Sequence, residues 1–229
     1  MRQDKGHKFW DKEYKDGRHL ALSNNPSEDL IKFTKWLGRN SIPNPLNPES
    51  SVLDLGCGNG RNLIYMAKTY SINGVGYDIS SEAISQAIEL SKELHLKYQV
   101  CSIAGPIKLE DKSQDIVLDM MTSHVLTSSE RENLQKEITR VLKPGGWLYL
   151  KTFLRDEDLH AKRLLRKHPA KEIGSYIHPK IGVAEHVFTE DEIRKILGKN
   201  FLIHKILRSH RNRKNCHSAI RRSISVYAE

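Results

Sequence analysis

The chain has 229 residues, of which 38% are hydrophobic, 28% are charged, 14 are glycine and 8 are proline. This length and composition fit one folded domain with a sizeable core, and they exclude a collagen-like or low-complexity chain. The 3 cysteines (Cys57, Cys101 and Cys216) are widely spaced, so we expect no disulfide framework and a cytoplasmic protein. We also expect no metal site, because no Cys/His cluster has zinc-ligand spacing.

We expect neither a membrane span nor a signal peptide. No apolar run approaches the roughly 18 residues that cross a bilayer, and the opening MRQDKGHKFWDKEY is too polar and too acidic for a leader. The net charge of +9 lies almost entirely in the last third: residues 1–154 hold 20 Lys and Arg against 19 Asp and Glu, whereas residues 155–229 hold 17 against 9. Such a segment attracts phosphate-bearing partners, or it is a solvated surface.

Two helices are predicted before the first strand. Residues 8–20 carry aromatic side chains at helical spacing. A second helix is predicted from about Pro26, with Asn25 as its cap. A proline-rich connection follows, and we interpret residues 1–45 as a helical lid on the main sheet.

Short apolar runs then alternate with helical stretches, which predicts an α/β domain with a mostly parallel sheet. Besides a helix capped by Ser80, helices are predicted over residues 61–70 and 129–142. The predicted strands are Ser51–Leu55, Gly74–Tyr77, Tyr98–Ser102, Asp115–Met121 and Trp147–Phe153.

The pattern changes after residue 155. A basic helix is predicted over residues 156–167, followed by a loop and by a helix whose start Thr189 and Glu192 mark as a capping box. Residues 201–207 and 223–227 alternate as strands. The very polar stretch from Arg208 to His217 between them predicts an antiparallel hairpin.

The segment VLDLGCGNG, from Val52 to Gly60, carries the strongest functional signal. It delivers a glycine-rich turn from a buried strand to a helix N-terminus, where the backbone can turn tightly and hold a polar ligand. Its spacing is G-x-G-x-G with an acid two residues before, unlike the G-x-G-x-x-G of dinucleotide sites. Eighteen residues later Asp78 ends the next strand, where a carboxylate can accept from both hydroxyls of a ribose.

This arrangement resembles the first motif of class I S-adenosylmethionine-dependent methyltransferases. Residues 115–121 and 141–147 are similar to the family's fourth strand and the approach to its fifth, so the resemblance covers about residues 45–155. It implies a Rossmann-like seven-stranded sheet, mostly parallel with the last strand antiparallel, with helices on both faces. It also implies S-adenosyl-L-methionine as the cofactor. The opening FWDKEY is similar to the lid helix of tellurite-resistance-type and uncharacterised bacterial small-molecule methyltransferases.

The resemblance assigns five residues to the methionine end of the cofactor. Four of them belong to the first motif and are expected to face the methionine part: Asp54, Gly56, Gly58 and Gly60. Met120 is expected to offer its backbone to the cofactor's amino group.

Four further residues are assigned to the adenosine end. Asp78 is expected to bind the ribose and Ile79 to pack on the adenine. Ser102 and Ile103 are expected to flank the adenine edge, where many relatives carry Asp in place of Ser102. A serine hydroxyl can still accept a hydrogen bond from the adenine amino group, but more weakly than an aspartate carboxylate.

Methyl transfer from a sulfonium is an in-line displacement, so the protein mainly aligns a nucleophile and, where necessary, removes its proton. Asp119 and His124 follow the fourth strand at the edge where ligands of open α/β sheets bind. Asp119 is a candidate to orient the acceptor and His124 a candidate general base. The alternatives are that Asp119 holds loop backbone and that His124 begins the next helix.

Candidate acceptor-binding residues lie in the lid and after the fifth strand: Trp10, Tyr14, Arg155, Tyr176 and His178. Trp10 and Tyr14 lie one turn apart and either cover the site or anchor the helix on the core. Relatives with a segment after the fifth strand use it to shape the acceptor pocket, so the same role is expected of residues 155–200.

The chain lacks the Asn/Asp-Pro-Pro-aromatic tetrad of amino-directed adenine and cytosine enzymes and the Pro-Cys pair of pyrimidine carbon-5 enzymes. We therefore expect a small polar or anionic acceptor. Two alternatives stay open: an RNA- or ribosome-directed methyltransferase, favoured by the basic tail, and a non-catalytic cofactor-binding protein.

Overall fold

The computed structural model describes residues 2–17, 22–209 and 221–229. Its strands are β1 (Ser51–Leu55), β2 (Asn73–Asp78), β3 (Leu96–Val100), β4 (Gln114–Met120), β5 (Leu142–Phe153), β6 (Ser175–Ile177), β7 (Ala184–His186), β8 (Ile203–Arg208) and β9 (Ser223–Ala228). Its helices are α1 (Arg2–Asp16), α2 (Glu28–Asn40), α3 (Arg61–Tyr70), α4 (Ser81–Leu90), the short 3-10 helix η1 (Ser123–Val125), α5 (Ser128–Val141), α6 (Leu159–Lys167) and α7 (Glu190–Leu197).

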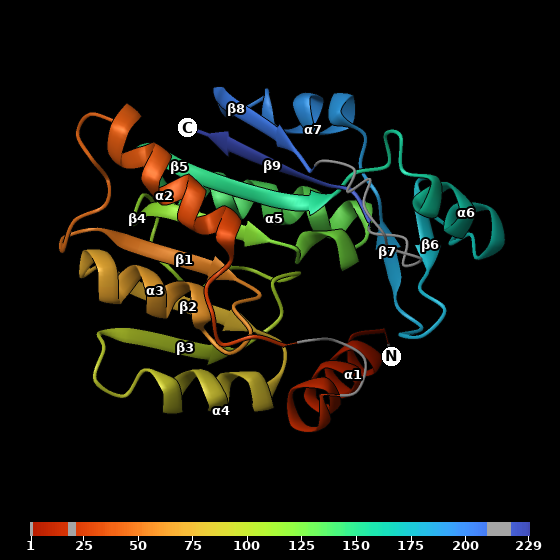
Figure 1. Cartoon of the computed structure of the whole chain (residues 1–229), viewed down its shortest axis with the longest axis horizontal. Coiled ribbons are helices and arrows are strands. Elements are labelled where there is room, and N and C mark those ends of the chain that lie inside the picture. Colours follow the sequence, from red (N-terminus) through yellow and green to blue (C-terminus); the bar gives the residue numbers. More distant parts are fainter. Residues whose placement is uncertain (1, 18–21, 210–220) are drawn as a thin grey trace, which may run out of the picture.

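The central sheet has seven strands in the order β3-β2-β1-β4-β5-β9-β8 (Figure 1). The strands from β3 to β5 pair in parallel, whereas β9 runs antiparallel to both β5 and β8. This confirms the predicted Rossmann-like fold. The chain leaves β1 toward β2 on one side and returns to β4 on the other, so the order reverses at β1. Ligands of open α/β sheets bind at such a reversal, outside the carboxyl ends of the strands.

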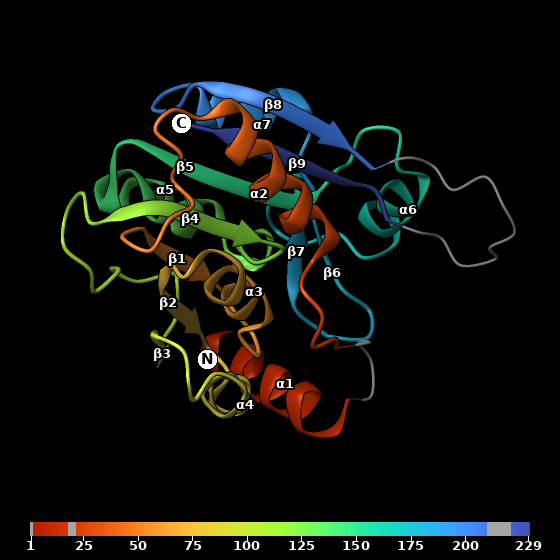
Figure 2. The same ribbon diagram turned by 60° about the vertical axis from the view of Figure 1, so that its left-hand side comes forward.

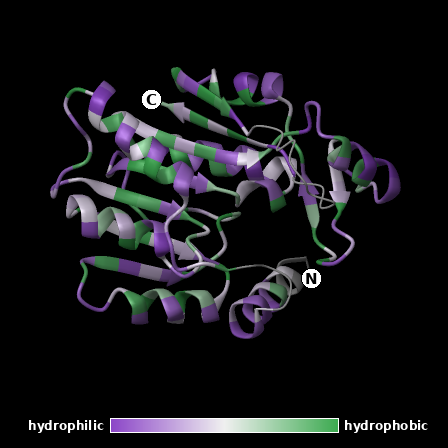
Figure 3. Ribbon diagram, viewed as in Figure 1, coloured by the Kyte–Doolittle hydropathy of each residue, from purple (hydrophilic) through white to green (hydrophobic). Residues whose placement is uncertain are grey.

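Alternate residues of each central strand face opposite layers of helices, because successive side chains in a strand point to opposite faces. Val52 packs in a cluster with Phe33 of α2 and Met66 of α3. The next residue, Leu53, packs in a second cluster with Leu134 of α5. Figure 3 shows the same division, with apolar strands between helices whose outer faces are polar. The central strands are therefore buried on both faces.

Several predicted boundaries are wrong by a few residues. Helix α2 begins at Glu28, and its N-cap is Ser27, not Asn25. Strand β3 runs from Leu96 to Val100, because these two residues pair with Gly74 and Asp78 near the two ends of β2. Helix α6 begins at Leu159, where the Asp158 side chain accepts from two backbone N–H groups.

The segment between α6 and α7 was expected to be a loop, but it contains the antiparallel pair β6 and β7. In Figures 1 and 2 this pair, α6 and α1 all lie beyond the carboxyl ends of the parallel strands. Parts of two predictions lie outside the described residues: residues 18–20 of the first helix, and most of the polar connection before β9, with Cys216. In the described part of the chain, no helix is long and apolar enough to cross a membrane.

Candidate functional site

The glycine loop between β1 and α3 (residues 56–60) turns through three left-handed residues. Gly56, Gly58 and Gly60 have φ angles of 69°, 57° and 75°, which favour glycine. The backbone N–H groups of Gly56 and Cys57 donate to the Tyr77 carbonyl at 2.7 and 2.9 Å and tie the loop to the end of β2. At Gly58 there is no room for a side chain, because a Cβ there would lie 2.1 Å from the Tyr14 hydroxyl.

Asp78 stands at the end of β2, directly beside this loop. Its Oδ2 accepts from the Gly58 N–H and its Oδ1 from the Ser80 N–H, each at 2.9 Å. Burial raises the pKa of Asp78 above its ordinary value, although these backbone hydrogen bonds favour the ionised form. A carboxylate offers about four acceptor positions, so two positions remain for donors of a ligand.

A cavity of about 340 Å³ opens over the loop and Asp78. Its volume lies within the roughly 300–1,000 Å³ that is typical of small-molecule sites. The cavity brings together most of the predicted cofactor residues and both lid aromatics: Trp10, Tyr14, Gly56, Gly58, Asp78, Ile79, Ser102, Ile103 and Met120.

Helix α1 is fixed over this cavity by polar contacts with α4. The Asp11 Oδ1 accepts from the Ser80 hydroxyl at 2.7 Å and from the Glu82 N–H at 3.2 Å. The Gln86 side chain donates to the Tyr14 carbonyl at 2.8 Å. These contacts hold Trp10 and Tyr14 against the cavity, and burial raises the pKa of the Tyr14 hydroxyl.

Two motif residues that were expected at the cofactor lie behind the cavity wall. Gly60 is the N-cap of α3, and a Cβ there would lie 2.5 Å from the Tyr98 hydroxyl. Asp54 is fully buried, and its Oδ2 has no hydrogen-bond partner among the described residues. Burial and the charge of Asp78 raise the pKa of Asp54 to about 8, so Asp54 is largely protonated at neutral pH.

Asp119 and His124, expected to be catalytic, do not line the cavity. The Asp119 Oδ1 accepts from the Ser123 N–H at 3.1 Å and holds the start of η1, which is the loop-holding alternative. Burial raises the pKa of Asp119 to about 6. The His124 ring packs edge-on against Phe153 at 4.9 Å between centroids. Burial lowers the pKa of His124 to about 4, against the charge of Glu185.

His124 belongs to a buried group on the far side of η1 that we call the Arg221 cluster: His124, Tyr176, Glu185 and Arg221. The Glu185 Oε2 accepts from the Tyr176 hydroxyl, and from Arg221 Nη1 at 2.7 Å. The Glu185 Oε1 lies 4.0 Å from His124 Nε2. Burial alone would raise the pKa of Glu185, but His124 and Arg221 hold it below the ordinary value.

The three acceptor residues predicted after the fifth strand lie in different surroundings. Tyr176 is in the Arg221 cluster, and the His178 ring lies 6.4 Å from the Tyr176 ring. Arg155 contacts neither this cluster nor the cavity. Its backbone N–H donates to the Phe188 carbonyl at 2.7 Å, and its side chain lies beside Gly174.

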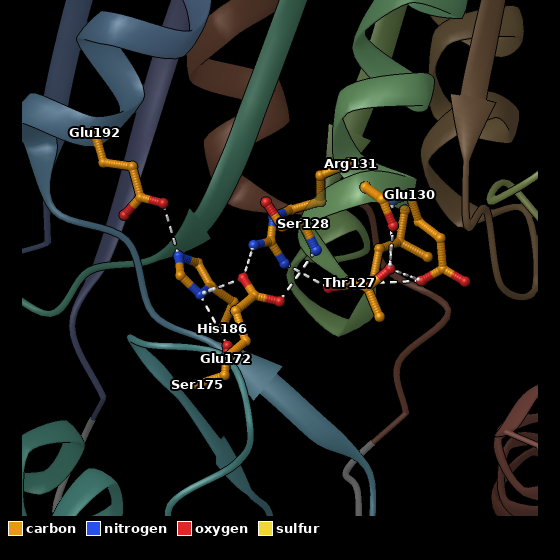
Figure 4. Close-up of polar contacts among 10 residues, drawn as sticks. Thr127, Ser128, Glu130, Arg131, Glu172, Ser175, His186 and Glu192 are labelled. Atoms are coloured by element: carbon orange, nitrogen blue, oxygen red, sulfur yellow. Dashed lines mark hydrogen bonds and ion pairs between the residues drawn. The ribbon is translucent and has the colours of Figure 1, made fainter.

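Figure 4 shows a second polar group, which we call the His186 network: His186, Ser175, Glu192, Glu172 and Arg131. Because His186 follows Glu185 directly in β7, this network lies on the opposite face of the β6–β7 pair from the Arg221 cluster. His186 meets Ser175 at 2.9 Å through Nδ1 and Glu192 at 2.8 Å through Nε2. Glu172 accepts from the Arg131 guanidinium and, at 3.0 Å, from the Ser128 N–H. This network fastens the segment after β5 to α5 and α7.

Several cavity residues were missed by sequence analysis, including Arg61, Asn59, Asn62 and Met121. A cation directly after the last glycine of the loop was a usable signal for Arg61. Met121 has a φ of 64°, which is unusual for a non-glycine residue and typical of functional sites. That backbone angle left no signal in the sequence.

Residues 52–146 match the family model of a methyltransferase domain. Among curated proteins, malonyl-[acyl-carrier protein] O-methyltransferase of Marinomonas sp. (strain MWYL1) is 33% identical over 109 residues, which are 47% of this chain and 40% of that protein. Glycine/sarcosine/dimethylglycine N-methyltransferase of Actinopolyspora halophila is 30% identical over 132 residues, 56% of this chain and 23% of that protein. The chain thus spans less than half the length of these curated relatives.

A solved SAM-dependent methyltransferase from Methanosarcina mazei has the same fold, with a TM-score of 0.68 at 27% identity. The match covers 82% of this chain and 95% of that protein. The family match holds β1, the glycine loop, Asp78 and β4, and it ends inside β5. The Arg221 cluster lies mostly outside it.

Proposed function

We propose that this chain, whose residues 52–146 match a methyltransferase domain, transfers the methyl group of S-adenosylmethionine to a small polar or anionic acceptor. The observation that carries the proposal is the cavity in which the glycine loop, the Asp78 carboxylate and the two lid aromatics meet. When bound, S-adenosylmethionine supplies an electrophilic methyl group on a sulfonium, so the protein's task is binding, alignment and exclusion of water.

The cavity residues fit an adenosine group at one end. The two acceptor positions left on Asp78 match two ribose hydroxyls, and charge-assisted hydrogen bonds of this kind are strong. Ile79 offers an apolar surface for the adenine. Ser102 and Ile103 line the same cavity and would flank the adenine edge.

The opposite end fits an amino acid group. Gly56, Gly58 and Met120 line this end of the cavity, and their backbone groups would hold the amino acid part of the cofactor. The Arg61 guanidinium lines the cavity too and would pair with a carboxylate. Asp54 and Gly60 would act from behind, by holding the loop in shape.

We assign lid and acceptor roles to the two segments beyond the strand ends. Within residues 1–45, Trp10 and Tyr14 would close over the cofactor and exclude water. Residues 155–200, with Tyr176 and His178, would form the acceptor side. The likeness of the first helix to tellurite-resistance-type enzymes stays a prediction.

Asp119 and His124 would support the reaction by holding η1 in place beside the cavity, not by transferring a proton. At neutral pH the Asp119 carboxylate would fix η1, which carries His124, beside the cavity. His124 would be neutral, and a base with a pKa of about 4 removes protons weakly. An acceptor that needs no strong base, such as an amine or a carboxylate, suits this arrangement.

The names of two relatives agree with such an acceptor: one acts on glycine and its methylated forms, and another, from Triticum aestivum, on phosphoethanolamine. A third acts on a malonyl group carried by a protein, which is a different class of acceptor. The test is transfer of radiolabelled methyl groups in fractionated cell extract. We expect label in the small-molecule fraction, and label confined to protein or RNA would contradict the proposal.

An RNA acceptor is the second candidate, favoured by α6. Lys162, Arg163, Arg166 and Lys167 are all exposed on this helix. Replacing Lys162 and Arg166 together by Gln tests their role. A tenfold rise in the Michaelis constant of a small anionic acceptor supports the first candidate. A collapse of RNA binding that is steeply salt-dependent in the parent protein supports RNA.

A further inference from the structure

The two polar groups on either face of the β6–β7 pair differ in how completely they are bonded. In the His186 network both ring nitrogens of His186 have partners. In the Arg221 cluster three buried nitrogens have no hydrogen-bond partner among the described residues: His124 Nδ1, Arg221 Nε and Arg221 Nη2. Buried polar groups are nearly always satisfied in folded proteins, so a group of unsatisfied donors calls for a ligand or water.

The free atoms of Arg221 form one edge of its guanidinium. Nη1 is occupied by the Glu185 carboxylate at 2.7 Å. Nε and Nη2 point two parallel N–H groups in one direction, and this spacing matches two oxygens of a carboxylate or a phosphate. The Arg221 guanidinium carbon lies 3.1 Å from the centroid of the Phe153 ring, which covers one face of the group. The two free N–H groups point outward in the guanidinium plane, so an anion that binds them would approach along this plane.

The cluster adjoins the cofactor cavity. His124 lies in η1, and both Val125 of the same helix and its N-cap Thr122 line that cavity. Phe153 ends β5, beside the carboxyl end of β4. An acceptor that spans the width of η1 would have one end at the cavity and the other at Arg221.

We propose that the Nε–Nη2 edge of Arg221 binds the anionic group of the acceptor, a carboxylate or a phosphate. This inference rests on the proposed function and names the substrate class of that site. The Arg221 side chain is 17% exposed, but the two nitrogens are shielded, so the anion enters by displacing the groups that shield them. Away from water, each charge-assisted hydrogen bond is stronger than at the surface.

Glu185 is the internal competitor in this arrangement. Its carboxylate neutralises Arg221 and also accepts from the Tyr176 hydroxyl. A Gln at this position keeps an oxygen for both donors and removes the negative charge. The proposal thus expects opposite effects from the two partners of one ion pair: Arg221→Gln weakens anion binding, and Glu185→Gln strengthens it.

The test follows the Arg221 Nε–H signal by NMR in protein with ¹⁵N-labelled arginine, saturated with S-adenosylhomocysteine. Malonate and inorganic phosphate are titrated separately, and the probe that binds more tightly names the class. We expect the anion to shift the Arg221 Nε–H signal of the parent protein. The affinity for the anion should fall at least about tenfold in Arg221→Gln and rise at least about threefold in Glu185→Gln. Arg221→Lys keeps the charge without the edge and should fall between. Arg208→Gln, which removes an exposed cation on β8, should match the parent protein.

The proposal is overturned if neither probe shifts the Arg221 signal, or if Glu185→Gln weakens binding as Arg221→Gln does. The second result would mean that the ion pair only supports the fold. Failure of S-adenosylhomocysteine to bind the parent protein would instead contradict the proposed function. If Arg221→Gln fails to fold, the Glu185→Gln and Arg221→Lys titrations still decide the question.

Discussion

Two walls of the site differ in how far apart their residues lie in the chain. One is the cofactor wall, formed by the glycine loop and Asp78, and the other is the acceptor wall, formed by the Arg221 cluster. Gly58 and Asp78 lie 20 residues apart on neighbouring strand ends and bond directly to each other. The Arg221 cluster joins η1, the β6–β7 pair and the segment just before β9, and Glu185 and Arg221 alone lie 36 positions apart. The cofactor wall is formed by short local motifs, so it can stay the same in proteins with different acceptors. The acceptor wall is formed by distant segments, which can vary independently to suit another acceptor.

The two walls also differ in charge. The cofactor wall includes the Asp78 carboxyl group, with the buried Asp54 carboxyl group behind it, and burial raises the pKa of both groups. The other wall holds a His124 ring that burial keeps neutral and an arginine with a free edge. One wall is thus suited to hydroxyl and amine donors, and the other to an anion.

The largest effect is expected at the glycine loop. Gly58→Val adds a β-branched side chain at a position where even a Cβ would lie 2.1 Å from the Tyr14 hydroxyl. We expect the cofactor's dissociation constant to rise at least about 100-fold in calorimetry, or roughly 2.7 kcal/mol. Gly182→Val is the matched control, because Gly182 has a φ of 71° but open space around it. Equal losses in the two variants would mean that backbone strain, not the cavity, is responsible.

A smaller loss is expected when the ribose carboxylate is removed. Asp78→Ala should weaken cofactor binding by at least about 1.5 kcal/mol, because two charge-assisted hydrogen bonds disappear. Asp78→Asn keeps the shape and one acceptor oxygen, so its affinity should lie between those of Ala and the parent protein. Unchanged affinity in a folded Asp78→Ala variant would remove the ribose assignment.

The buried titratable groups predict opposite pH dependences. Asp54 has a folded pKa of about 8 against an ordinary value of 3.8. In that window only the unfolded chain releases the proton, so the free energy of unfolding should fall as pH rises, relative to Asp54→Asn. His124 has a folded pKa of about 4 against 6.5, and its stabilisation should be lost as pH falls through that window, relative to His124→Gln. Each pKa unit corresponds to about 1.4 kcal/mol in urea unfolding, and parallel profiles would contradict the burial of these groups.

The smallest effect is expected at the contact between α1 and α4. Asp11→Asn removes the charge that faces the N-terminus of α4 and weakens the acceptor of Ser80 and Glu82. Cofactor affinity should fall about threefold, or roughly 0.7 kcal/mol. Lys12→Gln, one residue along and exposed, should leave affinity unchanged. No difference between the two variants would mean that α1 does not act as a lid.

The sequence predicted the cofactor wall well because its determinants are local. Residues 51–55 and 61–70 form the expected strand and helix with the expected bounds, since a buried apolar run and a glycine turn leave few alternatives. Ser80 caps α4 as expected, through its own hydroxyl. The two-residue error at β3 arose because an edge strand with mixed burial has no clear apolar pattern.

The acceptor wall could not be predicted to the same depth. Glu185 and His186 are adjacent, and only the strand geometry of β7 sends them to two different polar groups. Arg221 lies two residues before β9 and meets Glu185 only in the folded chain. The orientation of His124, away from the cavity, depends on Phe153 and Glu185, which no local pattern links to it.

The central claim is that the cavity over the glycine loop binds a sulfonium cofactor, and calorimetric titration of the parent protein tests it most directly. S-adenosylmethionine, S-adenosylhomocysteine and NAD would be titrated in turn under the same conditions. We expect dissociation constants on the order of micromolar for the first two ligands and no heat of binding for NAD. Binding of NAD without binding of either sulfur ligand would contradict it.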